Sequence, residues 1–294
     1  MASFDVITDS TSDLTFDIRQ QYTIDYLKID FTDGNKDYAA SLDWDQIGAH
    51  EFYESMRKGV RYKTYHVTEK KYDSLFRSHL SAGKDILFLS CSSALTNSVK
   101  TSYGVRDQLK KEFPDRKIIC IDSLNSGMSL GTMAIDVAKM RDQGKSIEEC
   151  EEWIENNKLF YNSCITVDTL TYLKDAGRVT GSSAFFGNLF AVKPILISDI
   201  KGQNLAVTKA KGRRSSISAM ADRVAEYIVE PDKQTIWIGH ADCFFDADEL
   251  EMELRKKIPK SDIKKYVMGA IVGLSAGPGT LVVNYKGRSK SEQM

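Results

Sequence analysis

Short apolar runs alternate with longer stretches of helical period along the first half of the chain. Amphipathic stretches lie near residues 44–58, 68–81, 95–112 and 126–143, and the runs between them have the length of buried strands: "FDVIT" at 4–8, "IDYLKIDF" at 24–31, "DILFL" at 85–89 and "KIICID" at 117–122. Strands separated by helices of this length are typical of a mostly parallel sheet with crossover helices. The pattern therefore predicts an α/β domain with helices on both faces of its sheet.

The pattern changes after a helix predicted at 147–159. Helices are predicted near 213–228 and 246–256, between strand-like runs near 235–240, 264–273 and 280–285. Adjacent strands of this kind suit a mixed or antiparallel sheet. We therefore predict two α/β domains, residues 1–160 with the parallel sheet and residues 161–294 with the mixed or antiparallel sheet and its helices.

Charge and cysteine content limit the classes of function. Lys and Arg total 40 and Asp and Glu total 41. Because basic residues are not in excess, the charge does not indicate binding of nucleic acid. The five cysteines form no C-x-x-C pair, which argues against a disulfide framework and a zinc site. We expect neither a metal nor a cofactor. Because we find no apolar stretch of membrane-spanning length and no signal-peptide pattern, we expect a cytoplasmic protein.

The stretch "TDSTSDL" at 8–14 follows the first predicted strand. Its Ser, Thr and Asp side chains are typical helix caps, and capping is the interpretation we favour for the motif alone. A ligand would also suit this place, because the binding crevice of an open α/β sheet lies beyond the carboxyl ends of its strands.

The stretch "FLSCSSALTNSVKTS" at 88–102 has the same placement after the strand 85–89. We expect a helix to begin near Leu95, with the hydroxyls of Ser92, Ser93 and Thr96 capping it and lying beside its free amides. Such a position suits a carboxylate or a phosphate. The chain has no histidine near this stretch, which weakens the case for nucleophilic serine chemistry.

Four other stretches have features of uncertain role, three of them polar groups and one a turn. The lone His66 and the glycine-flanked Arg178 are each typical of structural or surface residues, although a guanidinium could also face an oxyanion or a partner. The basic run of Lys211, Arg213 and Arg214 is most simply a solvated charge cluster. The segment 277–279, Gly-Pro-Gly, predicts a tight reversal between strands.

In their order and spacing, these stretches resemble the DegV family, which includes the fatty-acid-binding subunits of bacterial fatty acid kinase. The resemblance covers nearly the whole chain. It rests on "TDSTSDL", on "KTYHVT" at 63–68, on "SSALTNS" at 92–98, on "DTLTYLKDAGRVTG" followed by "KPIL" at 193–196, and on "GAIVGLSAGPGTL" at 269–281.

The resemblance implies two α/β domains and a bound long-chain fatty acid as the only ligand. Its carboxylate would lie near the domain junction and its acyl chain in an apolar tunnel, with residues 161–294 as the lipid-binding domain. By position, Thr64 and Ser93 would hold the carboxylate, together with Ser92, Thr96 and Ser275, and Arg178 would face a partner or a phosphate. Such a protein is a carrier without catalytic residues, which presents its ligand to a separate kinase subunit and contacts membranes peripherally during lipid exchange.

The sequence departs from the family pattern near the head group. Ser275 stands where the family has a histidine before its Gly-Pro-Gly turn, which removes a titratable donor. Tyr65, His66 and Val67 replace Ser-Gln-Pro, so His66 is a candidate for the missing imidazole. The serine stretch has Ala94 and Asn97 in place of two glycines.

Two alternatives to a carrier remain open from the sequence. One is a hydrolase of a phosphate or acyl ester that uses a serine of 90–93 or Asp9, and it requires a general base within hydrogen-bond reach of the nucleophile. The other is a regulatory or docking module with a vestigial pocket, which the loss of the histidine at 275 favours.

Overall fold

The chain folds into two compact units. The structure is a computed structural model that describes residues 4–181 and 192–293. The first unit comprises the chain up to Gln46 and residues 63–158, and the second comprises residues 47–62 and the chain from Leu159 onward. Residues 47–62, expected in the first domain, lie in the second unit because Tyr53 packs there and its hydroxyl donates to the carbonyl of Met268 at 2.6 Å.

The first unit is built on a four-stranded sheet in the order β2-β1-β6-β7. All neighbouring strands are parallel: β1 (Phe4–Asp9), β2 (Ile24–Leu27), β6 (Asp85–Ser90) and β7 (Ile118–Asp122). The run at 24–31 contains two strands, since β3 (Asp30–Thr32) joins a separate three-stranded sheet. That sheet has the order β4-β3-β5, with β4 at Asp37–Ala39 and β5 at Lys63–Thr64.

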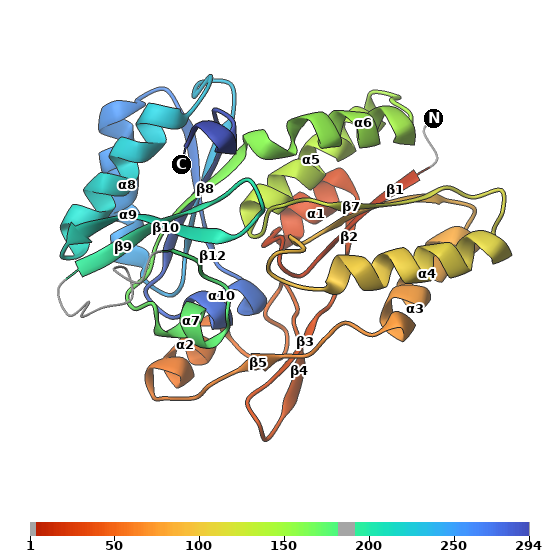
Figure 1. Ribbon diagram of the computed structural model, residues 1–294, viewed down its shortest axis with the longest axis horizontal. Coiled ribbons are helices and arrows are strands. Elements are labelled where there is room, and N and C mark those ends of the chain that lie inside the picture. The colour runs from red at the N-terminus through yellow and green to blue at the C-terminus, as the bar shows by residue number, and fades with distance from the viewer. Residues whose placement is uncertain (1–3, 182–191, 294) are drawn as a thin grey trace. The chain divides into compact units, whose positions relative to one another are not determined.

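Helices cover both faces of the parallel sheet (Figure 1). One group consists of α3 (Glu69–Ser81) and α4 (Ser98–Glu112), which pack together. The other consists of α1 (Phe16–Tyr22), α5 (Met128–Asp142) and α6 (Ile147–Asn157). The parallel α/β architecture predicted for this part of the chain is confirmed.

The second unit is built on a mixed six-stranded sheet in the order β10-β9-β8-β13-β11-β12. Among its described strands, only β11 (Thr235–His240) and β12 (Asp262–Val267) pair in parallel. The other pairings are antiparallel and involve β8 (Tyr161–Thr166), β9 (Val192–Ser198), β10 (Asn204–Lys211) and β13 (Leu281–Lys286). A mixed sheet is therefore confirmed for the second half.

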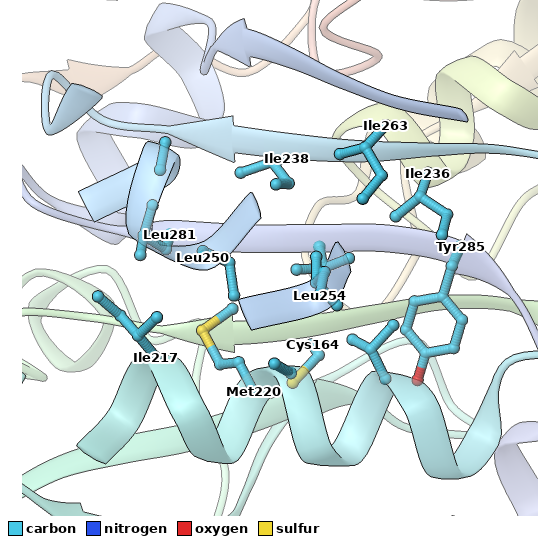
Figure 2. Close-up of a cluster of buried hydrophobic side chains, with 14 of the residues drawn as sticks. Cys164, Ile217, Met220, Ile236, Ile238, Leu250, Leu254, Ile263, Leu281 and Tyr285 are labelled. Atoms are coloured by element: carbon cyan, nitrogen blue, oxygen red, sulfur yellow. The ribbon is translucent and has the colours of Figure 1, made fainter. Parts of the chain in front are cut away.

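One face of this sheet packs against α8 (Arg213–Tyr227) and α9 (Phe244–Lys257). Figure 2 shows the core between them, where Ile217 and Met220 of α8 and Leu250 of α9 meet strand residues such as Ile238. A smaller apolar cluster contains Leu196 of β9 and Leu173 of the short helix α7 (Thr171–Asp175). Ile195 and Leu196 of β9 thus belong to different clusters, because successive side chains of a strand point to opposite faces of the sheet.

The strand expected at 264–273 is wrong in its second half. Strand β12 ends at Val267, and Ala270–Ala276 form the helix α10, which packs against α2 (Ala49–Arg57) and α7. A short apolar run does not by itself distinguish a buried strand from a buried helix. The Gly-Pro-Gly turn at 277–279 consequently joins a helix to β13 instead of two strands. No helix within residues 4–181 and 192–293 is long and apolar enough to cross a membrane.

Candidate ligand-binding site

The strand order of the parallel sheet reverses between β1 and β6, so their carboxyl ends lie at its topological switch point. From β1 the chain crosses to β2 on one side, and from β6 it crosses to β7 on the other. The connections that leave these two strands therefore diverge. Open α/β sheets bind ligands at such a crevice, and the motifs "TDSTSDL" and "SSALTNS" lie directly after β1 and β6.

The residues 91–97, which we call the serine loop, connect β6 to α4. Helix α4 begins at Ser98, three residues later than expected from Leu95, because the loop first makes a turn of its own. The Ser92 hydroxyl accepts from the amide of Ala94 at 3.2 Å, and the Thr96 hydroxyl accepts from the amide of Ser98 at 3.2 Å. These two hydroxyls therefore bond within the loop and the start of α4.

Ser93 differs from its neighbours in the serine loop. It is half-buried, and its hydroxyl has no hydrogen-bond partner within the part of the chain that the structure describes. Thr64, at the end of β5, is also half-buried, and its hydroxyl likewise has no partner among the described residues. Both hydroxyls are thus available to a ligand, and their role in holding a carboxylate stays a prediction.

His66 lies against the first turn of α4. Its Nε2 atom is 2.9 Å from the Thr101 hydroxyl, so this side chain ties the segment after β5 to the helix that follows the serine loop. The imidazole is exposed. The sequence suggested it as a substitute for the family histidine, and that role stays a prediction.

The motif "TDSTSDL" does not cap the helix that follows it, so that prediction is wrong. Helix α1 begins at Phe16 with Thr15 as its N-cap and without a side-chain cap. The fully buried Asp9 carboxylate accepts from the amide and hydroxyl of Thr11, at 2.9 and 2.6 Å, and from the amide of Cys91 at 2.9 Å. Burial raises the pKa of Asp9, although these hydrogen bonds oppose the shift.

Among the described residues, no hydroxyl of Ser90, Ser92 or Ser93 bonds to a carboxylate or an imidazole. Both oxygens of Asp9 accept hydrogen bonds, and His66 bonds Thr101 and not a serine of 90–93. Burial also raises the pKa of the neighbouring Cys91 thiol, which keeps this group protonated near neutral pH.

The other two predicted site residues belong to the second unit. Ser275 lies on α10, where its hydroxyl is 3.5 Å from the carbonyl of Ile271. Arg178 follows α7 and donates to the carbonyl of Ala176, two residues before it. Their predicted roles remain predictions. The apolar run "SSAFFGNLFAVKPILI" at 182–197 is a candidate lining for the acyl tunnel that the family resemblance implies, and it lies outside the described residues as far as 191.

A cluster in the second unit has the donor set of a metal site. His50 and Glu54 of α2 and Asp242 after β11 place their ligand atoms within 4.8 Å of one another. The guanidinium of Arg57 contacts both carboxylates, at 2.6 Å from Glu54 and 2.5 Å from Asp242. A cation of the protein thus already pairs with both carboxylates of this cluster, which we interpret as an ion-pair network.

Two features define the class of this protein. It is an α/β protein with a parallel sheet followed by a mixed sheet, and the uncharged hydroxyls of the serine loop follow the carboxyl end of β6. A family model described as "Uncharacterised protein, DegV family" matches residues 3–286. The chain therefore belongs to the DegV family, as its motifs indicated.

Similar proteins cover nearly the full length of the chain. A DegV domain-containing protein of Clostridium perfringens is 33% identical over 290 residues, which cover 99% of each chain. Among solved structures, a DegV lipid binding protein from Thermotoga maritima superposes with a TM-score of 0.85 at 22% identity and covers 98% of this chain and 99% of its own. The DegV fatty acid binding protein from Bacillus subtilis gives 0.83 at 22% identity, over 98% and 100% of the two chains. These likenesses show the fold.

Proposed function

We propose that the protein binds a long-chain fatty acid and holds its carboxylate with the hydroxyls of Ser93 and Thr64. The observation that carries this proposal is the half-buried Ser93 hydroxyl, which has no partner among the described residues and lies in the loop beyond β6. A hydroxyl donates well to a carboxylate. Support also comes from a solved structure of similar fold, from Eubacterium eligens, that is described as loaded with heptadecanoic acid.

Most of the affinity in this proposal comes from the acyl chain. Burial of one methylene contributes about 0.8 kcal/mol, so roughly fifteen of them offer on the order of 12 kcal/mol before the costs of ordering and association. One hydrogen bond to a charged group contributes about 1.5–3 kcal/mol. The head-group hydroxyls would therefore orient the ligand and add to its affinity without dominating it. That residues 161–294 hold the acyl chain stays a prediction.

The test is the lipid content and the affinity of the purified protein. We expect mass spectrometry of extracted lipid to find long-chain fatty acids, and we expect Ser93→Ala and Thr64→Val each to weaken oleic acid binding about 10- to 100-fold. Ser81→Ala, at the exposed end of α3, is the matched control. No co-purifying acyl lipid, together with no thermal shift on adding oleic acid, would rule the proposal out.

We propose further that the bound fatty acid is presented to a separate kinase subunit, which forms the acyl phosphate. A carrier of this kind needs no general base, in agreement with the partners of Asp9 and His66. The test is to incubate the protein with oleate and ATP, with and without such a kinase, and to trap acyl phosphate with hydroxylamine. Formation of the hydroxamate without the kinase, or failure to form it with the kinase from the same organism, would contradict this step.

A further inference from the structure

We propose that Asp122 and Asp9 are positioning residues that fix the backbone of the serine loop and so direct the Ser93 hydroxyl toward the ligand. This inference rests on the proposed function, because it concerns how the head-group donor is held. Neither aspartate was expected to act on Ser93 from the sequence. Both lie at the carboxyl ends of strands, Asp9 on β1 and Asp122 on β7, on either side of β6.

Asp122 holds the amide of Ser93 itself. Its Oδ1 atom accepts from the Ser93 amide at 3.1 Å and from the Leu124 amide at 3.1 Å. A second link joins the same two segments, since the Ser92 amide donates to the carbonyl of Asn125 at 2.9 Å. The turn after β7 therefore fixes two consecutive residues of the serine loop, and the direction of the Ser93 side chain follows from its backbone.

Asp9 holds the other end of the same segment. Its Oδ2 atom accepts from the Cys91 amide, whereas Oδ1 accepts from the amide and the hydroxyl of Thr11. This carboxylate joins the connection after β1 to the connection after β6, which leave the sheet in opposite directions. The serine loop is thus bonded to the ends of both neighbouring strands.

Hydrogen bonding to amides suits these aspartates better than contact with the ligand. A carboxylate next to the head group of a fatty acid would repel it, because like charges destabilise each other at short distance. Bonds from backbone amides offset this negative charge. The aspartates therefore act on the ligand through the loop, and their negative charge gives no advantage in binding.

The two aspartates use their oxygens differently, which predicts different effects of the same substitution. Both amides at Asp122 bond to one oxygen, so an asparagine can keep both bonds and remove a negative charge. Asp9 uses both oxygens, so an asparagine there must turn its amide group toward another donor. Asp122→Asn should therefore keep the two hydrogen bonds from backbone amides that Asp122→Ala removes. Asp9→Asn should not keep all the hydrogen bonds that Asp9 accepts.

The experiment measures the affinity for oleic acid by displacement of a fluorescent fatty acid, together with the melting temperature. We expect Asp122→Ala to weaken binding about tenfold or more and Asp122→Asn to bind within about threefold of the natural protein, or more tightly. Asp115→Ala, which changes an exposed aspartate near the amino end of β7, should change neither quantity. Asp9→Asn should weaken binding and lower the melting temperature.

A double-mutant cycle separates positioning from general destabilisation. If Asp122 acts through Ser93, the double variant Asp122→Ala, Ser93→Ala should bind within about threefold of Ser93→Ala alone. Additive losses, or an Asp122→Asn variant as weak as Asp122→Ala, would overturn the inference. The Asp122 variants decide it even if Asp9→Asn does not fold. If the natural protein binds no fatty acid, the proposed function fails, a result distinct from additive losses in a protein that binds.

Discussion

The two ends of the parallel sheet in the first unit use polar residues in opposite ways. At the carboxyl end, Asp9 and Asp122 bond to backbone amides, and the uncharged Ser93 hydroxyl is left available. At the amino end, charged groups bond to each other: His79 of α3 contacts Asp5 through Nδ1 at 2.7 Å and Asp25 through Nε2 at 3.1 Å.

A cavity lies at the amino end, and it raises the question of which end of the sheet suits a bound carboxylate better. Its volume is about 320 Å³, and Arg19 and His79 are among its lining residues. Both cations already have carboxylate partners, since Arg19 pairs with Asp43 at 2.6 Å. A ligand that recruited these groups would have to break ion pairs. Such competition is one reason why we propose the carboxylate site at the other end of the sheet, where the Ser93 hydroxyl has no partner among the described residues.

The largest effect on stability that we predict at the carboxyl end comes from a substitution of Gly131 on α5. A β-carbon built at this residue would lie 2.6 Å from the carbonyl oxygen of Ser12 and 3.0 Å from the side chain of Leu14. Since backbone cannot give way cheaply, Gly131→Ala should lower the free energy of unfolding by about 1–3 kcal/mol. Urea denaturation measures it. An unchanged midpoint would mean that the loop after β1 is not packed as tightly as described.

The amino end predicts a dependence of stability on pH. Hydrogen bonds to Asp25 and Asp5 raise the pKa of His79 to about 9, against 6.5 for the free side chain. Because the pKa of His79 is raised on folding, its hydrogen bonds to the two aspartates stabilise the folded state fully below about pH 6.5. This stabilisation is lost as the pH rises through 9. We expect the loss to be on the order of 1–2 kcal/mol, given partial screening by solvent.

The control for this dependence is His79→Gln. Urea denaturation between pH 6 and 10 should show a smaller decline in the variant than in the natural protein, because the group that titrates is gone. Oleic acid binding should be the same in both. A decline of equal size in the two proteins would show that other groups cause it, and weakened binding in the variant would break the contrast between the two ends.

The smallest predicted effect is a gain in stability at Gly104 on α4. A β-carbon here meets nothing within 4 Å, and the backbone is helical. Gly104→Ala should therefore raise the free energy of unfolding by about 0.5–1 kcal/mol, the usual difference between these residues in a helix. When both variants are measured in the same assay, the comparison shows whether close packing or helix propensity determines the sign of the change in the free energy of unfolding. A loss of stability at Gly104 would refute the assignment of open space there.

Local patterns were sufficient for most of the architecture. The alternation of apolar runs and amphipathic stretches predicted the parallel sheet, and the change of pattern after the helix at 147–159 predicted a mixed sheet. The errors lie where a local pattern has two solutions. The apolar residues before Gly277 form a strand end and a helix instead of one strand, and residues 47–62 pack far along the chain, with Met268.

The site was less predictable than the fold. Ser93 and Thr64 came from resemblance to a family, and spacing alone did not separate Ser93 from the other hydroxyls around it. The aspartates that hold the serine loop act over long separations in sequence, from Asp9 to Cys91 and from Asp122 to Ser93. Only the order of the strands brings such residues together, and no motif in a single stretch records that order.

The neutrality of the Ser93 side chain has a consequence for proton balance. A hydroxyl has one donor and two acceptor lone pairs, so it can donate to an ionised carboxylate and can equally accept from a protonated acid. An arginine or lysine in the same place would favour the ionised form alone. A head group held by a hydroxyl can therefore gain or lose its proton without losing its hydrogen bond to the protein.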